Sequence, residues 1–250
     1  MTNLCDTVHP LWKPFFQKEE AEVKSILAKL CTSEGHSEIT PEWDRIFRFA
    51  SFDPVNLQVV ILGQDPYPQK GAATGRSFEV GGMTDWTKPF RQSSLRNILR
   101  AIYQAKTGEA ILWTALREKI RTNEFAILPP DQLFSALENQ GVLFLNTYLT
   151  CQVGAPLSHA DIWQPFSESL ISFMDTCLPN RENTAWFLWG SHARSYGQLI
   201  QNGKKYESRH PMMTSSAPDD FLMNPCFRET AGLIDWTGVH YTTTTNERQY

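Results

Sequence analysis

The chain has 250 residues, of which 41% are hydrophobic and 20% are charged. This balance excludes a mainly disordered chain, and the length fits one compact domain with a large core. The net charge of −4 is weak evidence against nucleic-acid binding, because phosphate contacts need a positive surface.

The first elements along the chain are a strand and two helices. Residues 57–62 form a short, apolar, β-rich run that ends at glycine, which predicts a buried parallel strand. A helix is predicted after residues 87–89, and another is expected to start at Asp131 and to stop near Gly141. The first helix has apolar residues at helical spacing: Leu95, Ile98, Leu99, Ile102 and Tyr103.

The second half of the chain repeats this alternation. Further strands are predicted over residues 142–145 and 184–189, with a weaker signal over 205–208. Pro165 suits the first position of a third helix, and a fourth helix follows Gly190-Ser191 and ends at the Asn202-Gly203 turn. The apolar face of the third helix comprises Phe166, Leu170, Phe173, Met174 and Cys177.

Strands that alternate with helices predict an α/β fold with a central four-stranded, mostly parallel, twisted sheet flanked by helices on both faces. We expect a single domain over residues 1–241 and a polar C-terminal tail over residues 242–250. In open sheets of this kind, ligands bind beyond the carboxyl ends of the strands. The site is therefore sought in the residues that follow each predicted strand.

Those residues combine a carboxylate, an amide, backbone donors and an imidazole at one edge of the sheet. An amide such as that of Asn146 can pair with the edge of a nucleobase, since both groups donate and accept hydrogen bonds. Phe78 and Tyr67 can supply stacking and a steric wall. In strand order, the edge residues are Gly63-Gln64-Asp65-Pro66-Tyr67, Asn146, Gly190-Ser191 and His210-Pro211.

Other kinds of site lack their sequence signatures. The chain has no G-x-S-x-G elbow, no cysteine directly after a predicted strand and no glycine-rich phosphate loop. Its six histidines are scattered, so no metal site is expected. What remains is acid–base or electrostatic chemistry on a ligand that an amide recognises.

Location is indicated by what the sequence lacks. Its apolar runs are much shorter than the roughly 20 residues of a membrane span, and the N-terminus has no secretion signal. Five cysteines without a C-x-x-C pair favour a reducing compartment and buried thiols. We expect an intracellular protein, in the nucleus or host nucleus if eukaryotic or viral and otherwise in the cytoplasm.

The edge residues lie in segments that closely resemble the motifs of the uracil-DNA glycosylase family. The resemblance extends from about Trp12 to Trp236, and six motifs in the right order are more specific than any one of them. The water-activating motif corresponds to residues 59–67, the stacking-phenylalanine segment to 75–78, the DNA-backbone loop to 93–98, the uracil-reading segment to 141–146 with Leu149-Thr150, and the last two site motifs to 188–191 and 210–211.

The resemblance implies a DNA-repair enzyme that flips uracil out of single- or double-stranded DNA and hydrolyses its bond to the sugar, without a metal or cofactor. Asp65 would orient the attacking water and favour the cationic sugar, and His210 would donate to the departing uracil. The uracil-binding residues would be Gln64, Tyr67, Phe78 and Asn146. The DNA-binding residues would be Pro66, Ser94, Gly190, Ser191, Met212, Met213, Thr214 and Ser215. A monomer is expected, and replication or inhibitor proteins are partners that the sequence does not identify.

Three departures from the family pattern concern the DNA-facing loops. Pro68 replaces a common histidine, and the proline-rich loop is reduced to residues 90–94. At the position of the leucine that enters the duplex stands Thr214, and Met212 replaces a serine that contacts the backbone. Because a long apolar side chain can fill the gap left by a flipped base, we expect Met212 or Met213 to enter the duplex, and Met213 is favoured because it lies closer to the position of the leucine.

Two alternatives stay open at this point. The chain can be a DNA-binding replication accessory protein that retains the glycosylase fold, or a glycosylase for another lesion. Pro68 and the altered loop favour the first, whereas Asp65, Asn146 and His210 count against it. Tyr67 and Asn146 disfavour the second. Asp65 and Ser191 are also residue types that cap helices. Phosphate contacts are expected from the basic residues Lys88, Arg91, Arg194, Lys204, Lys205 and Arg209.

Overall fold

A four-stranded parallel sheet forms the centre of the computed structural model, which describes residues 8–32, 38–215 and 217–240. The strand order is β3-β2-β5-β6, and every neighbouring pair is parallel. The strands are β2 (Val59–Gly63), β3 (Val142–Asn146), β5 (Ala185–Trp189) and β6 (Lys204–Ser208). The predicted sheet is confirmed, and no strand end differs from its predicted position by more than two residues.

The strands separate two hydrophobic cores because successive side chains of a strand point to opposite faces. In β2, Val60 and Leu62 belong to one core, while Val59 and Ile61 belong to the other. All five residues of β2, of β3 and of β5 are buried. This explains why these strands read as continuous apolar runs rather than as alternating ones.

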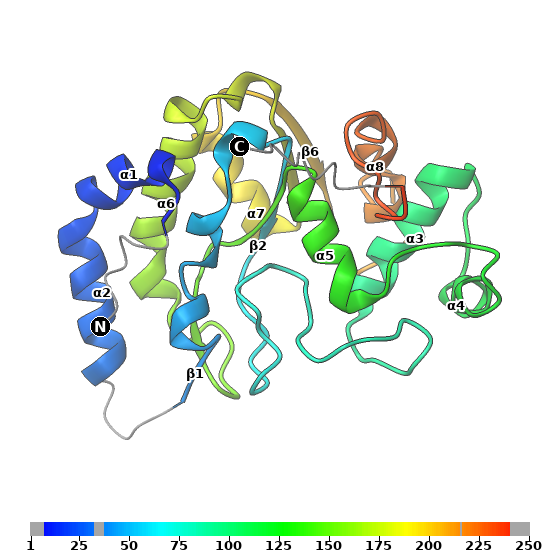
Figure 1. The fold of residues 1–250 in the computed structure, drawn as a ribbon, viewed down its shortest axis with the longest axis horizontal. Helices are drawn as coiled ribbons and strands as arrows, with labels where there is room; N and C mark the ends of the chain where they lie inside the picture. Colours follow the sequence, from blue (N-terminus) through cyan, green and yellow to red (C-terminus); the bar gives the residue numbers. More distant parts are fainter. Residues whose placement is uncertain (1–7, 33–37, 216, 241–250) are drawn as a thin grey trace, which may run out of the picture.

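Helices cover both faces of the sheet, as predicted. In Figure 1, α1 (Lys13–Lys18), α2 (Glu20–Thr32) and α6 (Ala160–Cys177) lie on one side. On the other side lie α3 (Ser93–Thr107), α4 (Trp113–Arg121), α5 (Pro130–Asn139) and α8 (Cys226–Glu229). The short α7 (Ser191–Ser195) directly follows β5.

The sequence analysis did not predict α1, α2, α4 or α8, nor a small antiparallel sheet of β1 (Ile39–Thr40) and β4 (Cys151–Gln152). Two-residue strands carry no periodicity, so pairing of this kind is decided by tertiary contacts. Short 3-10 helices complete the described elements: η2 (Pro10–Trp12), η3 (Trp43–Arg45), η4 (Arg48–Ser51), η5 (Pro54–Asn56), η6 (Arg181–Asn183), η7 (Tyr196–Leu199) and η8 (Phe221–Met223).

Two helix predictions need correction. Pro165 lies inside α6, which begins at Ala160. Its missing N–H is tolerated because this side of the helix is exposed, so water can bond the freed carbonyl. The helix after Gly190 is two short pieces, α7 and η7, which end before the turn at Asn202. There the Asp175 carboxylate accepts the N–H groups of Gln201 and Asn202, at 3.0 and 2.8 Å.

The expectation of buried cysteines is only half right among the described thiols. Cys151 and Cys226 are buried, but Cys31 and Cys177 are exposed. Cys177 therefore does not belong to the apolar face of α6. It is the last residue of that helix, and the next residue, Leu178, is the one that enters the core.

Within the described residues, no helix is long and apolar enough to cross a membrane. The predicted tail, residues 242–250, lies outside the described residues, so the domain boundary at residue 241 stays a prediction.

Candidate active site

The carboxyl ends of the four strands are level with one another. Gly63 pairs with Asn146 at the end of β2 and β3, and Trp189 pairs with Ser208 at the end of β5 and β6. The loop after β2, drawn in cyan, leaves the sheet at this edge (Figure 1). Backbone bonds connect the loops, since Tyr148 N–H donates to the Gln64 carbonyl at 2.9 Å. The predicted site residues therefore follow strand ends that lie side by side along one edge of the sheet.

Asp65 is held by a distant part of the chain. Its Oδ2 accepts the backbone N–H of Leu157 at 2.8 Å, while its Oδ1 is buried and accepts no hydrogen bond from the described residues. Burial raises the pKa of Asp65 to about 6, partly offset by the Leu157 N–H and the Cys151 thiol. Asp65 is therefore no helix cap, and its carboxylate is a largely buried group that only the Leu157 N–H and the nearby Cys151 thiol stabilise.

Leu157 and Cys151 are site residues that the sequence analysis did not identify. Leu157 has a left-handed backbone, with φ of 63°, and no sequence signal marks it. The fully buried Cys151 thiol donates to the Pro66 carbonyl, with 3.7 Å between sulfur and oxygen. Burial and the nearby Asp65 carboxylate raise the pKa of this thiol to about 12, so it stays protonated and fixes the turn that carries Asp65.

Asn146 occupies its place because Gly63 has no side chain. A Cβ at Gly63 would lie 2.3 Å from Asn146 Oδ1 and 2.7 Å from Ser77 Cβ. Asn146 is 7% exposed, and its amide makes no hydrogen bond with the described residues. Such a buried amide has unused donors and acceptors, which suits it to recognise the edge of a base.

Phe78 stands beside the imidazole of the site in a strained conformation. Its φ is 63°, a region that costs a non-glycine residue about 1–3 kcal/mol. The half-buried ring has its centroid 5.6 Å from Trp189 and 6.3 Å from His210. Both Phe78 and His210 are therefore placed to contact one flat ligand.

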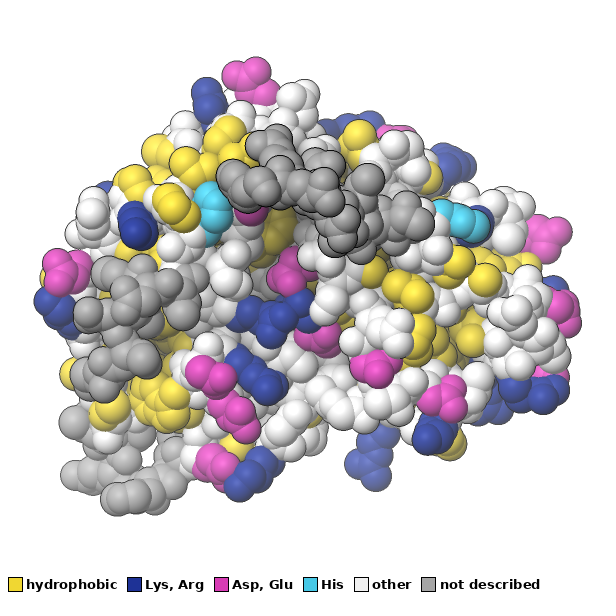
Figure 2. Space-filling model, viewed as in Figure 1, with side chains coloured by type: hydrophobic (Ala, Val, Ile, Leu, Met, Phe, Trp, Pro, Cys, Tyr) yellow, Lys and Arg dark blue, Asp and Glu magenta, His cyan; other side chains and the backbone are white. Residues whose placement is uncertain are grey.

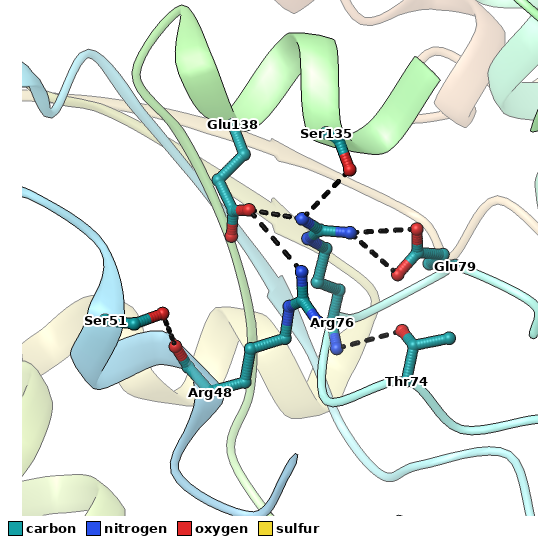
Figure 3. Close-up of polar contacts among 7 residues, drawn as sticks. All are labelled: Arg48, Ser51, Thr74, Arg76, Glu79, Ser135 and Glu138. Atoms are coloured by element: carbon teal, nitrogen blue, oxygen red, sulfur yellow. Dashed lines mark hydrogen bonds and ion pairs between the residues drawn. The ribbon is translucent and has the colours of Figure 1, made fainter. Parts of the chain in front are cut away.

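A buried ion cluster holds the segment that carries Phe78 (Figure 3). Arg76, 7% exposed, donates to both oxygens of Glu79 at 3.0 and 3.1 Å and also to the Glu138 carboxylate of α5. Arg48 lies 3.8 Å from the same Glu138. Removing one partner of such a buried pair costs about 3–5 kcal/mol, so the cluster can sustain the strain at Phe78.

His210 is fixed as a neutral donor. Its Nδ1 accepts the Met212 N–H at 3.1 Å, which leaves the ring proton on Nε2 when the imidazole is neutral. Burial lowers the pKa of His210, so the neutral form prevails near pH 7. Gly190 makes room for the ring, since a Cβ there would lie 3.0 Å from His210 Cβ.

Ser94 and Ser191 each stand in the first turn of a helix. Ser94 is the second residue of α3, whose Asn97 side chain donates to the Pro211 carbonyl at 2.6 Å. Ser191 is the exposed first residue of α7 and makes no capping bond. The N-cap of this helix is Gly190, and the Ser191 hydroxyl makes no hydrogen bond with the described residues.

The loop after His210 is anchored at its two ends. Ser215 N–H donates to the Asp220 carboxylate, and Ser215 Oγ accepts Ala217 N–H at 3.2 Å. Met212 and Met213 are 60% and 58% exposed, and Thr214 is also exposed. Neither methionine is buried beneath the loop, so both remain accessible to a ligand.

The other predicted uracil- and DNA-binding residues line the loop after β2. Tyr67 is half-buried, and burial raises its pKa to about 12, so its phenol is neutral. The Gln64 side chain is exposed and Pro66 is buried. Gln64 contacts the segment after β3 through its backbone carbonyl, which accepts the Tyr148 N–H and also the Thr147 hydroxyl, the latter at 3.1 Å.

His159 and His192 make hydrogen bonds with the segment that follows Asn146. His159 Nδ1 lies 2.9 Å from the Thr150 hydroxyl, and His192 Nε2 lies 2.7 Å from the Thr147 hydroxyl. Burial lowers the pKa of both imidazoles. They are neutral structural partners of the segment that follows Asn146.

Most of the basic residues expected to contact phosphates already make ion pairs or hydrogen bonds within the protein. Arg209 lies 2.9 Å from Asp219, Arg194 lies 3.6 Å from Glu207, and Lys204 pairs with Glu229. Lys205 donates to two backbone carbonyls. On the face in Figure 2, positive and negative side chains are interspersed. Lys88 and Arg91 are exposed and make no ion pair with the described residues.

No group of three or more His, Cys, Asp or Glu side chains that could hold a metal ion occurs in residues 8–32, 38–215 and 217–240. The functional groups at this edge of the sheet are thus a carboxylate, an imidazole, an amide and an aromatic ring.

Comparison with known proteins identifies one family. The model of the uracil DNA glycosylase superfamily matches residues 49–231. The chain is 36% identical over 243 residues to the uracil-DNA glycosylase of Epstein-Barr virus (strain B95-8), covering 89% of this chain and 83% of that protein. It is 32% identical over 205 residues to the uracil-DNA glycosylase of Francisella tularensis subsp. novicida (strain U112), covering 80% and 82%.

Solved structures of similar proteins share the fold. The mimivirus uracil-DNA glycosylase superposes with a TM-score of 0.63 at 25% identity, covering 84% of this chain and 71% of that chain. The UNG of Nitratifractor salsuginis superposes with a TM-score of 0.67 at 21% identity, covering 92% and 93%.

Proposed function

The chain belongs to the uracil DNA glycosylase superfamily, and from this premise we propose that it excises uracil from DNA with Asp65 and His210 as its catalytic residues. The single observation that carries these roles is the state of the two groups at the sheet edge. Asp65 offers a buried oxygen without a partner, and His210 offers a neutral ring with its free proton on Nε2.

The substrate contacts follow from the same edge. The Asn146 amide pairs with the edge of uracil, and Phe78 stacks on its ring. Tyr67 blocks the space that the methyl group of thymine requires. A target base reaches such a pocket only when it is unstacked from its neighbours, so the nucleotide is flipped out of the helix.

Charge then develops in two places as the bond between base and sugar breaks. The sugar becomes oxocarbenium-like, and the Asp65 carboxylate stabilises it, orients the attacking water and accepts the proton that the water loses as its oxygen bonds to the sugar. The uracil gains negative charge, and His210 Nε2–H donates to it. One preorganised donor of this kind contributes about 3–4 kcal/mol, and a neutral imidazole gives it without a prior protonation.

We assign the contacts with the DNA backbone to the loops around the site. Ser94 and Ser191 present hydroxyl groups that make no bond with the described residues, and Gly190 offers its backbone at close range. The exposed Met213 is assigned to the gap that the flipped base leaves. A monomer and an intracellular location stay predictions of the sequence.

A partner protein is proposed only by analogy. A variant of the mimivirus enzyme is known in complex with UGI. An inhibitor that covers the DNA-binding edge would meet Ser191, Met212 and Met213 in this chain, because these side chains are exposed there. A replication accessory role without catalysis is not favoured, since Asp65, Asn146 and His210 are all in place.

The direct test is excision of uracil. Purified protein is incubated with a single-stranded oligonucleotide that contains one uracil, and abasic sites are then cleaved with alkali. Cleavage at the uracil position is expected, with none in a matched oligonucleotide that carries thymine. DNA binding without any release of uracil from single or double strands would contradict the proposal and favour the accessory role.

A further inference from the structure

Leu157 combines three features that folding alone does not explain. Its backbone is left-handed, with φ of 63°. Glycine and asparagine adopt this conformation readily, whereas leucine is strained in it. Its side chain is 47% exposed, so its apolar surface contributes little to the core. Its N–H bonds to the catalytic carboxylate of Asp65 at 2.8 Å. Any residue except proline would provide that N–H.

Several hydrogen bonds hold the loop around Leu157. Gln152 N–H donates to Ser158 Oγ at 2.8 Å, and Gly154 N–H donates to the Pro68 carbonyl at 2.8 Å. Ala160 N–H bonds to the carbonyl of Leu157 itself at 3.1 Å. These hydrogen bonds hold the backbone at Leu157 in its left-handed conformation, and the side chain is exposed beside Asp65.

The place of this side chain determines what it can touch. Asp65 must lie against the sugar of the target nucleotide, and Leu157 is one hydrogen bond away from Asp65. A leucine side chain at that distance can reach the target strand next to the flipped nucleotide. Sugars and base faces offer apolar surface there, whereas the phosphates do not.

We propose that Leu157 is a DNA-contacting residue whose side chain packs against the target strand beside the flipped uridine. This inference rests on the proposed function and adds a substrate contact to it. The contact differs from that of Met213, because a group that fills the gap in a stack acts only on a duplex. Leu157 touches the strand that carries uracil, so it acts on single- and double-stranded DNA alike.

The test uses variants that keep the backbone and remove the apolar surface. Leu157→Asn and Leu157→Gly both suit a left-handed residue and retain the N–H for Asp65. Both are expected to raise KM about fivefold on single- and double-stranded uracil DNA, with kcat changed less than about twofold, because binding is lost equally in ground and transition states. Leu157→Met should keep the KM of the wild type, since it retains the apolar surface.

Two controls separate this role from a structural one. The melting temperatures of Leu157→Asn and Leu157→Gly should equal or exceed that of the wild type, because strain is relieved. Leu233→Asn removes another exposed leucine, 56% exposed, at the opposite edge of the sheet. Its neighbour Asp235 donates its N–H to Gln140, which precedes β3. This variant should leave KM unchanged.

An unchanged KM in both Leu157→Asn and Leu157→Gly, with an active wild type, would overturn the inference and leave the proposed function intact. A fall in kcat at constant KM would also overturn it, since Leu157 would then act only through the Asp65 hydrogen bond. A wild type that releases no uracil from either substrate would overturn the proposed function and this inference with it.

Discussion

The segment from Gly63 to Tyr67 and the loop from Pro211 to Ser215 face the same edge of the sheet, but the chain holds them differently. The first leaves a buried strand, and its Asp65 is bonded to Leu157 N–H at 2.8 Å. The second is tied at its ends, by Asn97 to the Pro211 carbonyl and by Asp220 to Ser215 N–H. Its middle residues are exposed.

This difference matches the two tasks of the enzyme. Stabilising charge in a transition state requires groups that are fixed before the reaction, and the residues proposed as catalytic lie where strand register and buried contacts position them. Opening a DNA stack requires an apolar side chain that adapts to an irregular gap, for which methionine is suited. Substitutions in the first segment should therefore affect every substrate, and substitutions in the second only the duplex.

The largest effect is expected from the catalytic pair. Asp65→Asn and His210→Ala should each slow uracil excision at least about 100-fold, because losing several kcal/mol of charge stabilisation costs about tenfold per 1.4 kcal/mol. The loss should be the same on single- and double-stranded oligonucleotides, measured as single-turnover rates. Near wild-type turnover of Asp65→Asn on single-stranded DNA would refute the mechanism.

The pH dependence should follow the raised pKa of Asp65, which is about 6. Because the carboxylate form is required, activity should be full above this value and should fall about tenfold per pH unit below it. The measurement is kcat/KM on single-stranded DNA as a function of pH, because this ratio reports the pKa values of the free enzyme. An acid limb centred near the ordinary aspartate value of 3.8 would contradict the burial of this carboxyl.

The same shift affects stability. The folded-state pKa lies above the unfolded value, so the folded protein binds the proton more tightly and loses stability as pH rises from about 4 to about 6. Asp65→Asn cannot ionise, so its free energy of unfolding near pH 7.5 should exceed that of the wild type by about 1–2 kcal/mol once solvent screening is allowed for. It should therefore also melt at a higher temperature. Thermal melts should show this gap closing toward pH 4.

A smaller but still general effect is expected from Gly63→Ala. The added Cβ would lie 2.3 Å from Asn146 Oδ1, so the amide must move, and misplacing a recognition group costs about 10–100-fold in kcat/KM. Gly232→Ala is the matched control, because a Cβ there meets nothing within 4 Å. Full activity of Gly63→Ala would show that Asn146 does not need its observed position.

The contrast between the two segments is tested most directly by Met213→Ala. It should lose about tenfold on double-stranded uracil DNA and little on single-stranded DNA, because a wedge acts only when a stack must be opened. Met223→Ala, which removes a methionine that is 66% exposed, serves as the control. Equal losses on both substrates would indicate that Met213 supports the loop, and the two segments would then not differ in task.

The smallest effect concerns salt. DNA affinity should fall log-linearly with salt, and Lys88→Ala and Arg91→Ala should each reduce that slope by about one if each contacts one phosphate. Lys204→Ala is the control, because Lys204 already pairs with Glu229. Affinity that does not respond to salt between roughly 50 and 200 mM would exclude these phosphate contacts.

Much of this architecture could be predicted from the sequence because its signals are local. Buried parallel strands are short apolar runs, so strands could be predicted over residues 57–62 and 184–189, close to the observed 59–63 and 185–189, and the residues that follow them mark the site. The motifs around Asp65, Asn146 and His210 each occupy a few consecutive residues, which is why the sequence indicated the chemistry and the residues assigned to it.

Other features depend on residues that meet only in the folded chain. The bond from Leu157 to Asp65 joins positions 92 residues apart, and the pair of Arg76 with Glu138 joins positions 62 apart. Neither has a periodicity or a motif. The start of α6 before Pro165 was likewise decided by the exposure of that side of the helix, which a local proline rule cannot anticipate.

The sequence by itself determined the four strands of the central sheet, the helices after three of them and the residues proposed to react, because propensity, hydrophobic pattern and motif are properties of neighbouring residues. Only the tertiary structure decided the state of those groups. The pKa of Asp65, the tautomer of His210 and the clearance at Gly63 each depend on atoms from a distant part of the chain or on the conformation of a loop. Burial and close contact, which set these properties, exist only after the chain has folded.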